Sequence, residues 1–207
     1  MDINSDHTII VSGSVDQTAI VWRYNETSGG YDSSQTLTDV QSYIPIVQIS
    51  GNGSVIVVGG GLQDVYVYLL DGDQYVSFQT LPNTGPVQAV AIDANSGAIA
   101  YSAVGDAGPT QLYAFNPENR QYELRQSLTS EVYSADWSST GANLFLGHGK
   151  VLEIYVYSDA DDSYKLLSKL DDALDNILSV DVSGAGDEWL ASASVDGNVY
   201  IYRLVGG

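Results

Sequence analysis

Short runs of alternating apolar and polar residues fill the chain, and turn residues separate them. The clearest runs combine aromatic and aliphatic residues, at positions 20–22, 65–68, 112–115, 154–157 and 199–202. Alternation with a period of two, together with abundant Val, Ile and Tyr, predicts β-strands. Gly, Asn, Asp and Ser between the runs predict tight turns. No 3.6-residue pattern of useful length predicts a helix.

The runs recur in a fixed order, which indicates an internal repeat. Each repeat starts with an apolar stretch that ends in a small or polar residue, at positions 4, 50, 93, 138 and 183. A segment of small and apolar residues follows, then the aromatic run, then a run of the form Tyr-x3-polar-polar-Leu. The period is about 45 residues, and four strands in that length is the size of one β-propeller blade.

The repeats predict an all-β protein with a single β-propeller domain over residues 1–207 and about five four-stranded blades. The repeat boundaries fall near 1–40, 41–85, 86–130, 131–175 and 176–207. No Tyr-x3 run follows Leu204, so we expect the last blade to lack its outer strand. Two explanations fit that missing strand. The sequence is part of a larger or slightly open propeller, or another chain supplies the strand by β-augmentation.

Two segments resemble the second and third strands of a WD40 repeat, VSGSVDQTAIVW at 11–22 and ASASVDGNVYIY at 191–202. Residues 47–59, followed by 65–68, are instead similar to integrin-type FG-GAP-like repeats. Arg23 stands where WD40 repeats carry the Asp of their name-giving dipeptide, and His148 falls in a strand rather than in the usual loop. Both resemblances imply a propeller, and neither implies a catalytic residue.

Composition limits the classes of partner that we expect and bears on the cellular location. Seven Lys and Arg against 26 Asp and Glu give a formal net charge of −19. Nucleic acids and anionic membrane surfaces would be repelled, so we expect neither as a partner. The absence of Cys excludes disulfides and thiolate metal sites, and no apolar stretch is long enough to span a bilayer. Few Lys and abundant Asp, Ser, Gly and Tyr favour an extracellular over a cytoplasmic location, which the sequence otherwise leaves unknown.

No catalytic motif emerges from the sequence. His7 and His148 have no partner at metal-ligand spacing. Neither a phosphate-binding P-loop nor a Gly-x-Ser-x-Gly elbow occurs. We therefore expect a protein that is not an enzyme and has no resident cofactor.

The acidic turn at 159–162 is the candidate metal site. Asp159, Asp161 and Asp162 can present several oxygens to Ca²⁺, although a solvated turn in an acidic protein explains the same pattern more simply. Asn25 and Asn52 begin Asn-x-Ser/Thr sequons in predicted turns. Both are candidates for glycosylation if the chain is secreted.

These observations favour a non-enzymatic β-propeller scaffold that mediates protein–protein interaction with an unidentified protein partner. The alternative is an extracellular structural or assembly subunit. In that case another chain supplies the missing strand, which produces an oligomer or a filament, and the sequons are available for glycosylation. That alternative makes a homo-oligomer through the open outer edge of the last blade. A hydrolase or lectin at the channel mouth is a third hypothesis, and no motif supports it.

Overall fold

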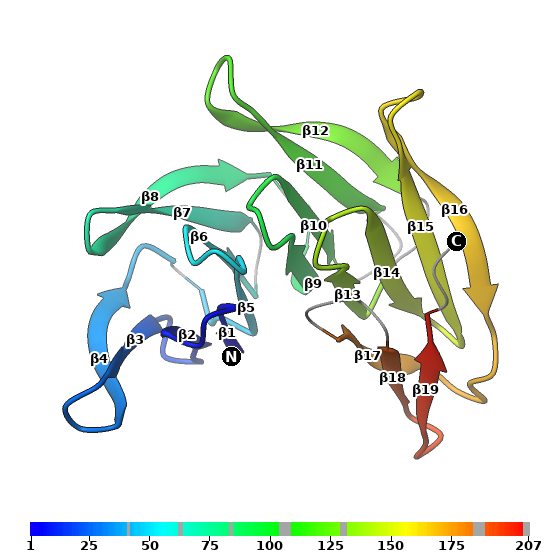
Figure 1. The fold of residues 1–207 in the computed structure, drawn as a ribbon, viewed down its shortest axis with the longest axis horizontal. Helices are drawn as coiled ribbons and strands as arrows, with labels where there is room; N and C mark the ends of the chain where they lie inside the picture. The colour runs from blue at the N-terminus through cyan, green and yellow to red at the C-terminus, as the bar shows by residue number, and fades with distance from the viewer. Residues whose placement is uncertain are drawn as a thin grey trace.

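The computed structural model describes residues 1–40, 42–61, 64–82, 85–103, 109–128, 132–183 and 189–204. These residues form 19 β-strands and no helix. Figure 1 shows five sheets arranged around one axis, with the blue first sheet and the red last sheet at the two ends of the series. The fold confirms the prediction of an all-β propeller with five blades.

Each sheet is antiparallel, and its strands follow one another in chain order from the axis outward. Blade 1 contains β1 (Asp2–Ile3), β2 (Ile9–Gly13), β3 (Ala19–Asn25) and β4 (Gly30–Leu37). Blade 2 contains β5 (Ile46–Ile49), β6 (Val55–Gly59), β7 (Val65–Asp71) and β8 (Gln74–Leu81). Blade 3 contains β9 (Val87–Ile92), β10 (Ala98–Ala103), β11 (Thr110–Asn116) and β12 (Gln121–Leu128).

Blade 4 contains β13 (Ser134–Trp137), β14 (Asn143–His148), β15 (Val151–Ser158) and β16 (Ser163–Leu170). Blade 5 contains three described strands, β17 (Ile177–Val182), β18 (Trp189–Ser194) and β19 (Val199–Arg203). The predicted lack of an outer strand in the last blade is therefore confirmed for the described residues. The prediction that His148 lies in a strand is also confirmed.

The recurring tyrosine of the fourth strand closes the first turn of its own blade. The Tyr75 hydroxyl donates to the carbonyl oxygen of Gly53 at 2.5 Å, and the Tyr122 hydroxyl donates to that of Ser96 at 2.6 Å. Both accepting residues have positive φ, 70° and 65°. Tyr31 and Tyr164 make the same bond to His7 and Gly141. A left-handed turn and a distant tyrosine thus form one unit, which explains why both recur in the sequence.

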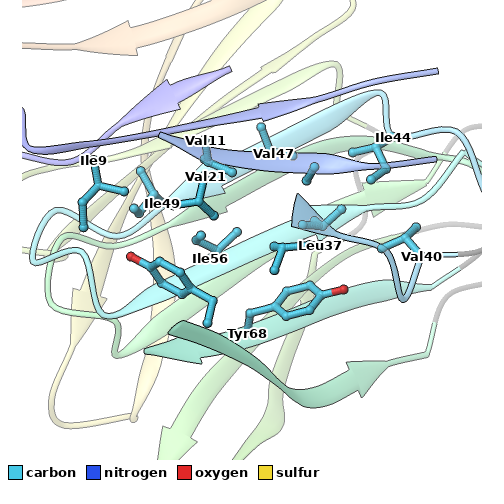
Figure 2. Close-up of a cluster of buried hydrophobic side chains, with 13 residues drawn as sticks. Ile9, Val11, Val21, Leu37, Val40, Ile44, Val47, Ile49, Ile56 and Tyr68 are labelled. Carbon is cyan, nitrogen blue, oxygen red and sulfur yellow. The ribbon is translucent and has the colours of Figure 1, made fainter. Parts of the chain in front are cut away.

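Apolar side chains between neighbouring blades form the core. Figure 2 shows Val11 and Val21 of blade 1 pointing toward Ile49 and Ile56 of blade 2. Four such clusters join blade 1 to 2, 2 to 3, 3 to 4 and 4 to 5. Among the described residues, no cluster joins blade 5 back to blade 1. Burial between blades is the main stabilising contribution, because a single sheet has no interior of its own.

The blades approach one another so closely that some positions tolerate no side chain. A methyl group built on Gly59 would lie 2.5 Å from Ile46 Cγ2 and 2.7 Å from Val87 Cγ1 of the next blade. The junction of blades 3 and 4 achieves close packing in a different way. There Trp137 packs on Ala89, Ala91 and Ala100, so one large side chain faces several small ones.

Glutamine side chains link the outer strands of successive blades. Gln35 Nε2 donates to the carbonyl oxygen of Tyr75, and Gln35 Oε1 accepts from the Tyr75 amide, both at 2.7 Å. Gln79 with Tyr122 and Gln126 with Tyr164 repeat this pair of bonds. Ser168 holds the equivalent position in blade 4, whose neighbour has no described fourth strand. The link therefore occurs where a neighbouring tyrosine strand is present to accept it.

Candidate functional site

The first strands of the blades surround a central channel. A cavity of about 670 Å³ lies there, lined by residues of β1, β5, β9, β13 and β17. Asp2, Gln48, Asp136 and Asp181 hold the same position of the repeat in four blades, and blade 3 has Ala91 there. The channel wall is consequently polar and carries negative charge, and no Lys, Arg or His is among its lining residues.

Two of these carboxylates bind the backbone of the following blade. Asp2 Oδ2 accepts from the Ile49 amide at 2.8 Å, and Asp136 Oδ2 accepts from the Val182 amide at 2.8 Å. Burial raises the pKa of Asp136 to about 7. Hydrogen bonds from the backbone amides of Val182 and Trp137 oppose this shift, whereas the negative charges of Asp181 and Asp2 add to it. Burial also raises the pKa of Asp2. The channel thus holds one carboxyl group, that of Asp136, whose charge changes near neutral pH.

The channel carboxylates do not converge on a metal-binding point. Within the described ranges, no group of three or more His, Cys, Asp or Glu residues is placed to hold a metal ion. Asp136 directs one oxygen to Val182 and the other to the amide of Trp137. The arrangement therefore attracts cationic groups electrostatically and joins blades, but it provides no coordination shell.

The predicted calcium ligands lie together on the turn between β15 and β16. Asp162 pairs with Arg125 of blade 3 and accepts from the Tyr157 hydroxyl. Asp161 Oδ2 lies 3.5 Å from Lys165 Nζ. Hydrogen bonding from Tyr157 and the charge of Arg125 lower the pKa of Asp162. Calcium binding by Asp159, Asp161 and Asp162 stays a prediction, and it would compete with these cations.

Asn52 lies in a turn, as the sequence predicts, whereas Asn25 is the last residue of β3 and the turn begins at the next residue. Asn25 Nδ2 donates to Asp32 Oδ2 at 2.6 Å, and its Oδ1 accepts from the Thr27 amide at 2.8 Å. Asn52 Oδ1 accepts from the Ser54 amide at 2.9 Å and is exposed. Glycosylation at either asparagine stays a prediction.

His148 belongs to an ionic cluster in blade 4 that is centred on the buried carboxylate of Glu153. Its Nε2 lies 3.3 Å from Glu153 Oε1, and Lys169 Nζ lies 2.7 Å from the same oxygen. The Tyr155 hydroxyl donates to Glu153 Oε2 at 2.9 Å. Burial works to raise the pKa of Glu153, but these partners outweigh it and the pKa lies below its ordinary value. Paired in this way, the Glu153 carboxylate is committed to Lys169 and Tyr155 and is not free to act on a ligand.

Exposed apolar side chains lie on loops at the end of the propeller where β2 turns into β3 and where β4 connects to blade 2. We call this end the loop face and define it by Val15, Tyr43, Leu174 and Val195. Val15 is 83% exposed and Leu174 is 71% exposed. The Ile44 amide donates to the Ser14 carbonyl, so the first two tips lie on adjoining loops. No basic residue besides Lys150 lies in the described loops and turns at this end.

Hydrogen bonds hold the second pair of tips together. The Leu174 amide donates to Asp196 Oδ2 at 2.8 Å, and the Val195 amide donates to the Asn176 carbonyl at 2.9 Å. Desolvation works to raise the pKa of Asp196, but hydrogen bonds from Leu174 and Tyr200 lower it to about 2. Further exposed carboxylates surround the tips: Asp16, Asp39, Asp171, Asp172 and Asp175. The loop face therefore combines apolar tips, held by hydrogen bonds, with a group of exposed carboxylates.

Sequence reasoning missed the channel carboxylates and the loop-face tips. Asp2, Asp136 and Asp181 do occupy one column of the repeat, and that column is the signal that would have identified them. The tips carried no such signal, since Val15 and Val195 look like ordinary strand residues in the sequence. Only their position in turns makes them exposed.

Trp22 and Arg23, at the end of the first segment that resembles a WD40 repeat, have different hydrogen-bond partners. Trp22 Nε1 donates to Ser12 Oγ at 2.9 Å, whereas Arg23 reaches the Asp73 carbonyl of blade 2. The family model described as WD domain, G-beta repeat matches residues 1–23 and 164–203. The first match covers the inner strands of blade 1, and the second covers β16 and all of blade 5. No curated protein matches the chain. Among the described residues, there is no helix with the length and apolarity to cross a membrane.

Proposed function

Because the chain is a WD40-like β-propeller repeat protein, we propose that it is a non-enzymatic scaffold that binds another protein at the loop face. WD40 propellers are generally scaffolds of this kind. The partner segment that fits the loop face is basic and partly apolar. The observation that carries the proposal is the set of exposed apolar tips, Val15, Tyr43, Leu174 and Val195, among carboxylates.

Two physical contributions support this partner chemistry. Leu174 and Val195 lie on two loops that are joined by hydrogen bonds. Apolar side chains of the partner that pack on these two residues are removed from water, which contributes favourably to the free energy of binding. Lysine or arginine side chains of the partner are attracted by the surrounding aspartates. With a net charge of −19 behind them, these aspartates accelerate association at low ionic strength.

A synthetic peptide of alternating Lys and Leu tests the proposal, with a peptide of alternating Glu and Leu as its charge-reversed control. We expect the basic peptide to bind the full-length protein, with affinity that decreases as salt increases. Leu174→Ser and Val195→Ser should weaken binding at least about tenfold, which corresponds to about 1.4 kcal/mol. Leu124→Ser, on the exposed side of β12, should leave affinity unchanged. Equal binding by the three variants would refute a role for the loop face.

The second candidate function is a structural or assembly subunit outside the cell. Its support is β19, which is the outermost described strand of blade 5 and lacks the fourth-strand partner present in the other blades. Such an edge accepts an extended segment through backbone hydrogen bonds. A peptide with the sequence of β12, residues 121–128, should raise the melting temperature, and a scrambled peptide should not. No rise with either peptide would argue against strand completion.

A further inference from the structure

The side of each blade that faces the next blade along the chain has the same construction throughout. We call it the forward face. In the third strand, Val21, Val67 and Ile154 lie on this face in blades 1, 2 and 4. Val21 and Val67 are 0% exposed, and Ile154 is 9% exposed. Contact with the following blade therefore buries this column of the repeat.

Blade 5 presents the same face without a cover. Ile201, the equivalent of Val21, is 68% exposed, and Val199 on the same strand is 65% exposed. The register of β18 with β19 puts Ala191 beside Ile201 and Trp189 beside Arg203. Trp189 is 47% exposed. The forward face of blade 5 is consequently an open apolar sheet in the described structure.

Two charges of opposite sign lie at the two margins of this face. Asp181 on β17 is paired with Ala191 on β18, which is paired in turn with Ile201 on β19. Arg203 lies two residues beyond Ile201 on β19, and its guanidinium lies over the Trp189 ring at 5.8 Å. An acidic margin and a basic margin therefore flank a central apolar strip.

We propose that this face binds the same face of a second copy of the chain, related by a two-fold axis that runs along β18. That rotation places β17 of each copy opposite β19 of the other. Asp181 then faces Ile201 of the second copy, and Arg203 lies about 7 Å further along that strand, within reach of an arginine side chain. Each copy contributes one acid and one base, so the contact contains two opposite-charge pairs around the apolar strip.

A second copy of the chain is the partner that fits this face, because the face is complementary to itself. An isologous contact needs a surface that matches itself after a half-turn. An apolar centre with Asp181 on one margin and Arg203 on the other satisfies that condition. Two sheets stacked face to face lie about 10 Å apart, the usual spacing of a β-sandwich, so Ile201, Val199 and Trp189 become buried in both copies. The inference is independent of the loop face and of the outer edge of β19.

Sedimentation velocity across a range of protein concentrations is the first test. We expect a reversible dimer, and we expect Ile201→Glu to weaken it at least about tenfold, because the dimer would bury the new charge. Leu124→Glu on β12 is the matched control, since it places the same charge at an exposed leucine in another blade. Circular dichroism melting verifies that both variants are folded. A monomer at every concentration would overturn the proposal.

Charge exchange separates this contact from a general loss of structure. Asp181→Arg alone and Arg203→Asp alone each put like charges opposite one another, so each should weaken the dimer. The double variant Asp181→Arg with Arg203→Asp restores opposite charges and should recover the dimer. Failure of the double variant to recover it would contradict the proposed pairing.

Single cysteines test the geometry, because the natural chain has no Cys. Residues of β18 lie beside the proposed axis, so the two Ala191→Cys side chains face each other across the gap of about 10 Å between the sheets, and a short bis-maleimide should cross-link them into a dimer. Ile10→Cys, on the side of blade 1 that faces away from blade 2, is the control and should stay monomeric. Cross-linking through Ile10→Cys and not through Ala191→Cys would overturn the two-fold arrangement.

Discussion

Replacement of Asp136 by Asn should destabilise the protein at pH 3 and stabilise it at pH 8. The pKa of Asp136 lies near 7 because burial disfavours the charged form, against an ordinary value of 3.8. Between those two values the native state holds a proton that the unfolded chain has released. The free energy of unfolding therefore falls as pH rises through this window, and that contribution is lost completely above pH 7.

The magnitude follows from the size of the shift. Each unit of pKa difference corresponds to about 1.4 kcal/mol, so ionisation of Asp136 costs the native state about 4 kcal/mol between pH 3 and pH 8. Asparagine avoids this cost. It also has one carbonyl oxygen where the carboxylate has two, so it loses the bond from either Trp137 or Val182, which costs about 1 kcal/mol at every pH. We expect Asp136→Asn to be less stable than the wild type at pH 3 and more stable at pH 8.

Urea unfolding monitored by tryptophan fluorescence measures both proteins at each pH. Asp159→Asn, on the exposed turn after β15, is the control for a general change in net charge, and its profile should run parallel to that of the wild type. The same parallel profile for Asp136→Asn would show that Asp136 does not ionise near neutral pH, and the burial argument would then be wrong.

Three further predictions test the contacts between blades and the acidic turn. Gly59→Val should destabilise the protein by more than about 3 kcal/mol in urea unfolding, because its side chain would overlap Ile46 and Val87. Gln79→Ala should cost about 1–3 kcal/mol, since the Tyr122 amide and carbonyl lose their partner, whereas Ser168→Ala should cost less than about 0.5 kcal/mol. Calcium bound at the 159–162 turn would raise the melting temperature in millimolar Ca²⁺, and Asp161→Asn would reduce that rise; an unchanged melting temperature removes the site.

The channel carboxylates and the loop-face residues differ in whether the fold itself needs them. The channel carboxylates Asp2 and Asp136 are largely committed to the backbone of the next blade, so they position the blades. The loop-face residues Leu174 and Val195 have no comparable structural task, because they are exposed on turns that backbone bonds already hold. Exposure without a packing role is the physical reason to assign recognition to the loop face.

Much of the local structure was predictable from particular residues. The tyrosines at 31, 75, 122 and 164 marked the fourth strands, and the structure adds the reason, a hydroxyl bond to the first turn of the same blade. The aromatic runs marked the third strands. The candidate site was less predictable, because a carboxylate such as Asp136 has the same neighbours in sequence whether it binds a metal, a ligand or a backbone amide.

Strand type, strand order and the 45-residue period depend on neighbours within a few residues, so the sequence alone determined them. Which side chains are buried depends on the sheet that lies opposite, and only the tertiary structure decided that. Val21 and Ile201 occupy the same column of the repeat and have similar flanking residues, yet one is enclosed and the other is mostly exposed. The difference arises because blade 2 covers the first residue, whereas no described sheet covers the second.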